Sequence, residues 1–105
     1  MTTRNARIEE VKLYIDDHGF LACVVELDYG SSCQGFGAFD LYNPDLRTDA
    51  FAGHFLMSIL RIADVQDWKQ LVGKIVRVKL DDGLIKSIGH VIHEDWFTPT
   101  DFFKK

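Results

Sequence analysis

Cysteine and proline are scarce in this sequence of 105 residues, which contains two of each. Cys23 and Cys33 are too few for a disulfide framework and lack the spacing of a structural zinc site, so both classes of small protein are excluded. The sequence also lacks the run of about 18 apolar residues that a membrane helix requires. Its start has no apolar segment of the kind found in signal peptides. These absences predict a protein of a reducing, cytoplasmic compartment.

Runs of basic residues are absent as well, and the net charge is −4 at neutral pH. Proteins that bind duplex nucleic acid usually carry a basic stripe, so this class is disfavoured. The apolar fraction of 47% and the charged fraction of 27% are ordinary for a globular protein and argue against disorder. We expect residues 1–105 to form a single α+β domain, with residues 1–6 and 100–105 loosely ordered.

Alternating apolar residues predict five strands, which cover about Arg7–Asp16, Phe20–Leu27, Phe36–Leu41, Lys74–Leu80 and Leu84–His93. The second of these strands is apolar on both faces, so both faces must be covered. The dipeptide Asp82-Gly83 is typical of a two-residue hairpin turn. Such a turn would place Leu80 opposite Ile85 and Val78 opposite Ser87.

The segment Ala50–Ala63 is nearly all apolar and predicts one helix that is buried nearly all round. The elements therefore follow the order β-β-β-α-β-β, an antiparallel sheet packed on one central buried helix. One small sheet cannot cover such a helix and also hide both of its own faces. We therefore expect self-association, most often as a two-fold dimer, with higher oligomers as an alternative.

Polar residues that interrupt apolar elements, and aromatic residues near them, are the candidates for a binding site. A half-buried arginine needs an anion, either a carboxylate of the same chain, which is the more common partner, or a ligand phosphate. Aromatic side chains can stack on a ring, although a place in the core is their more common role. A glycine-rich segment can bind phosphate through its amides, but this one lacks the Lys-Ser/Thr end of a P-loop. The candidate ligand-binding residues are Gln34, Gly35, His54, Arg61, Arg77, His90, Trp96 and Phe97.

A metal-dependent hydrolase is the competing interpretation, with His90, His93 and Asp95 as ligands and His54 as a fourth. Positions three apart on a strand point to opposite faces, so His90 and His93 converge only if the strand ends between them. Cys33 has no base nearby in the sequence, and the serines lack a nucleophile elbow. The sequence therefore favours a non-enzymatic binding protein without a cofactor or a metal.

Four segments resemble a family of small proteins encoded by bacteriophages and prophages. They are Ser32–Gly37 (SCQGFG), Ala52–Phe55 (AGHF), Trp68–Val78 (WxxLxGKxVRV) and Ile88–Pro99 (IGH to DWFxP). The family loop has a further glycine where Ser32 and Cys33 stand. The resemblance covers about residues 12–99 and implies a viral accessory protein in the host cytoplasm. Such a protein would sequester a small anionic, nucleotide-like ligand or inhibit a host defence protein, with a virion or assembly component as the alternative.

Overall fold

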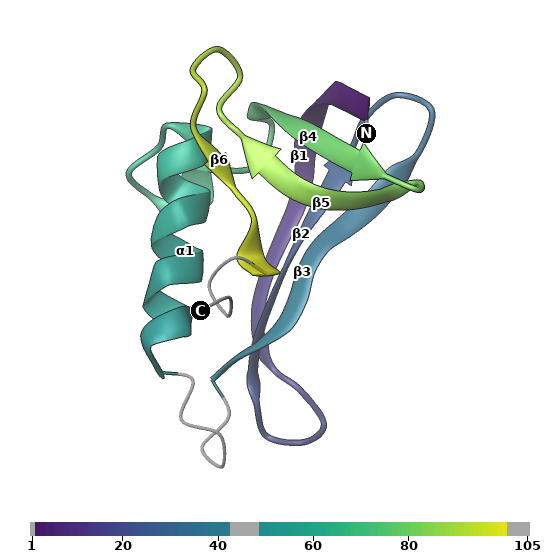
Figure 1. Cartoon of the computed structure of the whole chain (residues 1–105). Coiled ribbons are helices and arrows are strands. Elements are labelled where there is room, and N and C mark those ends of the chain that lie inside the picture. Colours follow the sequence, from purple (N-terminus) through teal and green to yellow (C-terminus); the bar gives the residue numbers. More distant parts are fainter. Residues whose placement is uncertain (1, 43–48, 101–105) are drawn as a thin grey trace.

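The computed structural model describes residues 2–42 and 49–100, which form one antiparallel sheet and one long helix (Figure 1). The α+β class predicted from the sequence is confirmed. In chain order the elements are β1 (Thr2–Ile15), β2 (Leu21–Asp28), β3 (Cys33–Tyr42), α1 (Asp49–Ala63), the 3-10 turn η1 (Trp68–Gln70), β4 (Ile75–Asp81), β5 (Leu84–Gly89) and β6 (Trp96–Phe97).

Strand β1 is shared by the two halves of the sheet, whose order is β3-β2-β1-β4-β5-β6. Its residues Arg7–Ile15 pair with β2, and its residues Thr2–Arg7 pair with β4. A bulge between Ile8 and Glu10 lies at the change of partner, and bulges bend a strand and increase its twist. Loose order was predicted for residues 1–6, but this is wrong for Thr2–Ala6, because β4 supplies partners that no local pattern reveals.

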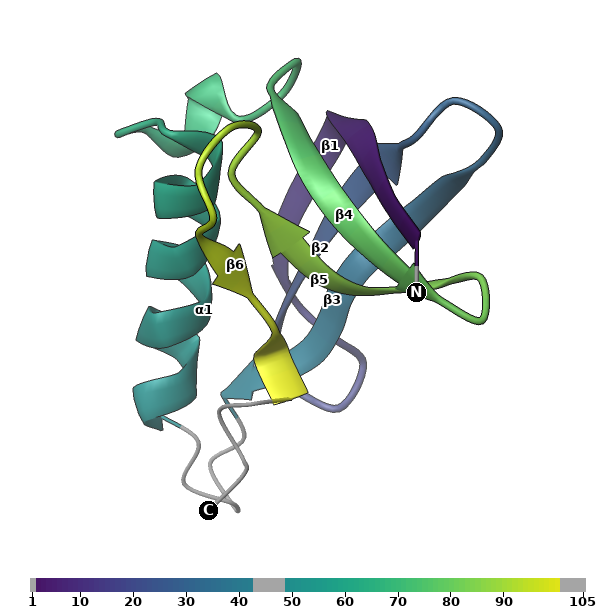
Figure 2. The ribbon, with the colours of Figure 1, turned by 45° about the horizontal axis from the view of Figure 1, so that its top comes forward.

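The sheet curls until its strands β3 and β5 approach each other without pairing (Figure 2). Because each strand is antiparallel to its neighbour, β3 and β5 run in the same direction. The connectivity β1-β2-β3-α1-β4-β5 with this strand order is that of the OB-fold, a partly open five-stranded barrel. Helix α1 packs along the open side, where it contacts β3, β4, β5 and β6.

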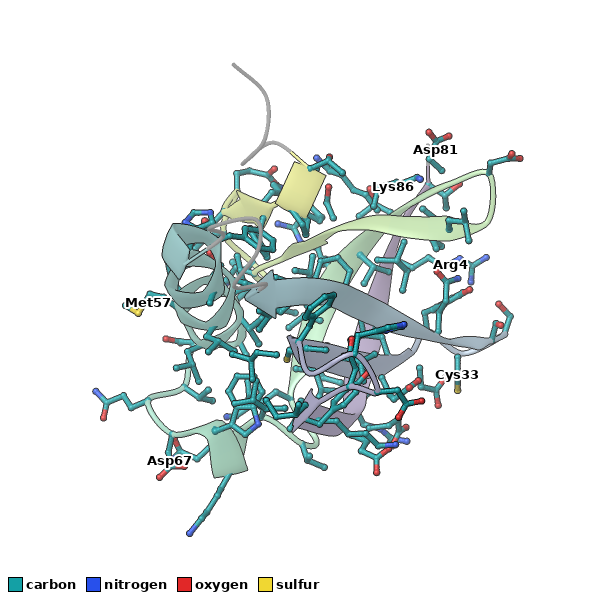
Figure 3. All side chains as sticks on the ribbon, turned by 90° about the horizontal axis from the view of Figure 1, so that it is seen from below. Arg4, Cys33, Met57, Asp67, Asp81 and Lys86 are labelled. Atoms are coloured by element: carbon teal, nitrogen blue, oxygen red, sulfur yellow. The ribbon has the colours of Figure 1, made fainter. Side chains whose placement is uncertain are left out.

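Helix α1 begins one residue before the predicted start and ends at the predicted Ala63. Its Phe51, Phe55 and Ile59 are fully buried, but Met57 is 65% exposed and points away from the sheet in Figure 3. The helix is therefore buried on one face and is not central, because the curled sheet encloses its own core and offers the helix a single side. No helix within the described ranges is long and apolar enough to cross a membrane.

An aromatic cluster joins the helix to the sheet. The ring of Phe55 lies 5.5 Å from that of Phe97 and 6.3 Å from that of Phe36, measured between centroids. Gly37 has a φ of +104°, and a Cβ there would lie 2.8 Å from the carbonyl oxygen of Cys23 and 3.0 Å from Cζ of Phe55. Glycine is therefore required where β3 passes under the cluster.

The β4–β5 hairpin turns at Asp82 and Gly83, whose φ values of 55° and 79° suit a two-residue turn. Leu80 faces Ile85 as predicted, but the predicted pairing of Val78 with Ser87 is wrong. A register shift at Lys86 reverses the faces of the residues that follow, because side chains alternate along a strand. Ile88 consequently enters the core, and Ser87 and Gly89 face outward with the outer residues of β4.

Strand β2 is covered on both faces within one chain. Cys23, Val25 and Leu27 face the core and are fully buried. On the outer face Ala22 is 3% exposed and Val24 is half-buried. The two-faced apolar pattern of this strand therefore does not by itself require a second subunit.

Candidate ligand-binding surface

The outer surface of four strands collects polar side chains around one tryptophan. Cross-strand partners lie on the same face of a sheet, and the pairings of β1 with β4, β4 with β5 and β5 with β6 create two rows. We refer to the surface formed by these two rows as the Trp96 face: Thr3, Asn5, Arg77, Lys79, Ser87, Gly89 and Trp96.

The indole of Trp96 lies against the backbone of Gly89. A Cβ on Gly89 would lie 2.5–2.7 Å from three carbon atoms of the ring, so only glycine leaves room for it. The guanidinium carbon of Arg77 is 4.9 Å from the ring centroid, and the ammonium of Lys79 is 4.1 Å from it. Both distances are in the range of cation–π attraction. The indole is thereby held on the sheet beside two positive charges.

Arg77 holds the loop between β5 and β6. Its Nε donates to the carbonyl of His90 at 2.8 Å, and its Nη2 donates to the carbonyl of His93 at 2.7 Å. The same Nη2 lies 3.2 Å from Oε1 of Glu94. The hydrogen bond from Trp96 Nε1, and then that from Arg77, lower the pKa of Glu94 below its usual value. Arg77 thus directs both its Nε and its Nη2 donors to groups of the same chain.

Arg61 is also paired with a carboxylate of the same chain. Its Nε and Nη2 donate to the two carboxylate oxygens of Asp95 at 3.0 and 3.1 Å, the bidentate geometry typical of arginine and carboxylate. This pair ties α1 to the β5–β6 loop. Phe97 is a candidate for stacking on a ligand, but it is only 4% exposed and belongs to the core. The rings of His54 and Phe97 form a T-shaped pair, with 5.5 Å between their centroids.

The histidines of the β5–β6 loop lie together, because β5 ends at Gly89 and not at the predicted His93. The rings of His90 and His93 are 4.5 Å apart, but Nδ1 of His90 accepts the backbone N–H groups of Ile92 and His93 at 3.0 and 3.1 Å. Asp95 is occupied by Arg61. Among residues 2–42 and 49–100, no group of three or more histidine, cysteine or acidic residues is arranged to hold a metal. The proposed set of His54, His90, His93 and Asp95 therefore forms no metal centre.

Gln34 and Gly35 do not belong to the Trp96 face. They lie on β3, since the connection after β2 ends at Ser32 and the glycine-rich segment is mostly strand. No phosphate-binding loop forms there. The Gln34 carboxamide instead spans to the β4–β5 hairpin: Nε2 donates to the carbonyl of Gly83 and Oε1 accepts from the N–H of Ile85, both at 2.8 Å. Gln34 is a structural bridge between β3 and β5.

We expect the variant Gln34→Ala to loosen this bridge. Because a hydrogen bond contributes about 1 kcal/mol net, amide hydrogen exchange at Ile85 should accelerate roughly fivefold. The variant Gln34→Glu keeps an acceptor for the Ile85 amide but places a carboxylate against the Gly83 carbonyl, so it should rescue only part of the protection. Gln66→Ala, on the exposed connection after α1, serves as the control. Unchanged exchange at Ile85 in Gln34→Ala would show that the bridge is dispensable.

The two thiols are predicted to react slowly. Burial raises the pKa of Cys23 to about 12. Cys33 is exposed, but partial desolvation and then the negative charges of Asp28, Glu9 and Glu26 raise its pKa. Since the thiolate is the reactive form, iodoacetamide should leave Cys23 unmodified in the native protein and should alkylate Cys33 more slowly than a cysteine in a short peptide. Mass spectrometry before and after denaturation in urea measures both, and a fast native reaction at Cys33 would contradict this electrostatic environment.

Lys79, Ser87 and Gly89 were not singled out by the sequence. A glycine within a strand indicates a close approach of another group, so Gly89 carried a usable signal. The outward positions of Ser87 and Gly89 depend on the register shift at Lys86, which has no local signature.

Comparisons with known proteins give no match: no family model, no curated protein and no solved structure is significantly similar to this chain. The connectivity alone is therefore the link to OB-folds, which bind oligonucleotides with the face of their second and third strands and the adjoining loops. Here the corresponding loops carry Asp16, Asp17 and Asp82, and the outer face of β2 carries Glu26 and Asp28. The equivalent surface of this chain is therefore acidic.

Proposed function

We propose that this protein is a non-enzymatic binding module that holds a small anionic, nucleotide-like ligand on the Trp96 face. The observation that carries the proposal is the position of Lys79. Its ammonium lies 4.1 Å from the centre of the Trp96 ring, and no ion pair between described residues includes it. A positive charge without a direct ion pair suits a ligand phosphate, although Glu94 lies near enough for Lys79 to help lower its pKa. The neighbouring indole suits a ligand ring.

Polar groups around Lys79 support this assignment. Thr3 is its cross-strand partner on β1, and Asn5 follows in the next row, so a hydroxyl and an amide are available as donors to phosphate oxygens. Arg77 adds positive charge beside the same ring, although Glu94 offsets part of it. We therefore expect an affinity that falls as salt is added, because the charges lie at the surface.

Isothermal titration with inorganic phosphate and with a panel of mono-, di- and triphosphate nucleosides and cyclic dinucleotides tests the proposal. Lys79→Ala should weaken binding about tenfold, the effect of losing a charge-assisted hydrogen bond. Lys69→Ala, which removes the same charge from η1, is the matched control and should bind normally. The proposal would be contradicted if no compound of the panel binds at millimolar concentration. It would also be contradicted if Lys79→Ala and Lys69→Ala bind with equal affinity.

Self-association is part of the same proposal. Leu13 and Ile15 lie on the core-facing side of β1 but are 48% and 65% exposed. Burial of such apolar area between two subunits is favourable. Sedimentation velocity should therefore find a dimer or higher oligomer of the natural protein and a monomer of Ile15→Asp. A strict monomer of the unaltered chain at high concentration would overturn this part without affecting the ligand site.

A viral accessory role remains a prediction from the sequence. The acidic outer face of β2 and the tight internal pairing of Arg61 and Arg77 do not favour one class of host target over another. Gene neighbourhood distinguishes an inhibitor of host defence, expected among early accessory genes, from a virion or assembly component, expected among structural genes.

A further inference from the structure

The second half of β1 has a free edge. Strand β1 pairs with β2 as far as Ile15, but β4 pairs only with Thr2–Arg7. Beyond Ile8, no backbone hydrogen bond between described residues lies on the side of β1 that faces away from β2. In Figure 1 the β1–β2 hairpin extends well beyond β4 and β5. Residues Glu10–Ile15 therefore have a neighbouring strand on one side only, and we refer to their open side as the β1 edge.

The backbone groups of alternate residues point out of the β1 edge. At the turn into β2, the N–H of Asp16 donates to the carbonyl of Phe20 at 2.9 Å, so the backbone of Asp16 faces β2. Hydrogen-bonded and non-hydrogen-bonded positions alternate along an antiparallel pair. The N–H and C=O groups of Val11, Leu13 and Ile15 therefore point away from β2. Such a row of unpaired donors and acceptors is a template on which a further strand pairs.

The side chains of the β1 edge are apolar on both faces of the sheet. Leu13 and Ile15 lie on the core-facing side and are 48% and 65% exposed, and Tyr14 lies on the outer side and is 41% exposed. Proteins usually protect a free edge with a proline or a charge, but residues 13–15 contain neither. Both the backbone and the side chains of this stretch are thus left open to a partner.

We propose that the β1 edge pairs with the β1 edge of a second copy, antiparallel about a two-fold axis at Leu13 or Tyr14. This inference rests on the self-association proposed above and specifies its geometry. With the axis at Leu13, this residue faces its own copy and Lys12 faces Tyr14. With the axis at Tyr14, Leu13 faces Ile15, and Lys12 faces Asp16, a pair of opposite charges. An axis at Lys12 is disfavoured, because it opposes two lysines.

The match of the β1 edge to itself favours a second copy over another protein. In both registers the core-facing side chains Leu13 and Ile15 meet apolar side chains of the other copy, so their exposed area is removed from water. A two-fold pair also uses both edges at once and leaves none for further association. The expected product is a closed dimer, in which the two sheets become one.

Cysteine cross-linking tests this inference on the full chain. A residue on the axis lies about 4.5–5.5 Å from its own copy between Cα atoms, within the reach of a disulfide. The copies of its neighbours are offset along the strand and lie beyond that reach. In a Cys33→Ser background, which removes the exposed native thiol, we expect Leu13→Cys or Tyr14→Cys to form a covalent dimer on oxidation with diamide. Lys12→Cys and Ile15→Cys are the matched controls and should remain uncross-linked.

The variant Leu13→Pro tests the backbone hydrogen bonds. Proline removes an N–H that points away from β2, so no bond within the described chain is lost and the circular dichroism spectrum should be unchanged. Each copy loses one donor to the other. The dissociation constant of the dimer should therefore rise about thirtyfold relative to Leu13→Ala, which keeps the donor. Sedimentation velocity over a range of concentrations measures both variants.

The inference is overturned if the unaltered chain sediments as a dimer but neither Leu13→Cys nor Tyr14→Cys cross-links, or if the control variants cross-link equally well. Equal dimerisation of Leu13→Pro and Leu13→Ala would also overturn it. In these cases self-association stands and uses another surface. A strict monomer of the unaltered chain overturns self-association and this inference together. Nucleotide titration of the same samples is measured in parallel, so failure at the β1 edge is distinguishable from failure at the Trp96 face.

Discussion

Replacement of Phe55 by alanine is expected to lower the free energy of unfolding by about 3–5 kcal/mol. Phe55 is fully buried, and its ring packs against Phe36, Phe51 and Phe97 at centroid distances of 6.3, 5.9 and 5.5 Å. Removal of the ring leaves a cavity where α1, β3 and β6 meet, and these rings come from separate elements that cannot easily close it. Equilibrium unfolding in urea, followed by circular dichroism, measures the loss.

Met57→Ala is the matched control for this prediction. Met57 lies two residues further along α1 and is 65% exposed, so its truncation should change the free energy of unfolding by less than about 0.5 kcal/mol. Similar losses for the two variants would mean that the outer face of α1 is covered in solution. That result would contradict one-sided burial in a monomer and would instead support burial of this face in an oligomer.

Replacement of Gly89 by alanine is expected to displace Trp96 from the sheet and to weaken ligand binding at the Trp96 face. The added Cβ would lie 2.5 Å from Cε3 of the indole, so the ring must lift and lose its contact with Lys79. Overpacking of this kind costs about 1–3 kcal/mol. In a Trp68→Phe background, the emission of Trp96 should shift to the red as water reaches the indole, and nucleotide titration should show weaker binding.

Gly53→Ala makes the same chemical change, but we expect it to stabilise the protein and not to destabilise it. Gly53 lies within α1, and no atom lies within 4 Å of an added Cβ. Alanine should therefore stabilise the protein by about 0.5–1 kcal/mol, the difference in helix propensity between the two residues. An unshifted Trp96 emission in Gly89→Ala, or equal effects of the two substitutions, would contradict the close packing of Trp96 on β5.

The structure brings some of the candidate site residues together and places others elsewhere. Arg77 on β4 lies beside both His90, which directly follows β5, and Trp96 on β6: it donates to the carbonyl of the first and lies over the ring of the second. Arg61 and Phe97 also lie there, but one is paired with Asp95 and the other is in the core. The partner of an arginine was not predictable, because sixteen acidic residues compete for it and only folding selects one.

Local patterns determined the elements of this protein. The apolar run of α1, the alternation in the strands and the dipeptide Asp82-Gly83 act over a few residues, so the sequence by itself was enough to predict one helix, five strands and a hairpin. Only the tertiary structure decided which edges meet. The pairing of Thr2–Arg7 with β4 joins distant segments, and the register shift at Lys86 reverses the faces that follow. A one-residue shift of register moves Gly89 to the outer face, beneath Trp96. The candidate site therefore depends on the register between β4 and β5, which the sequence of a single strand does not fix.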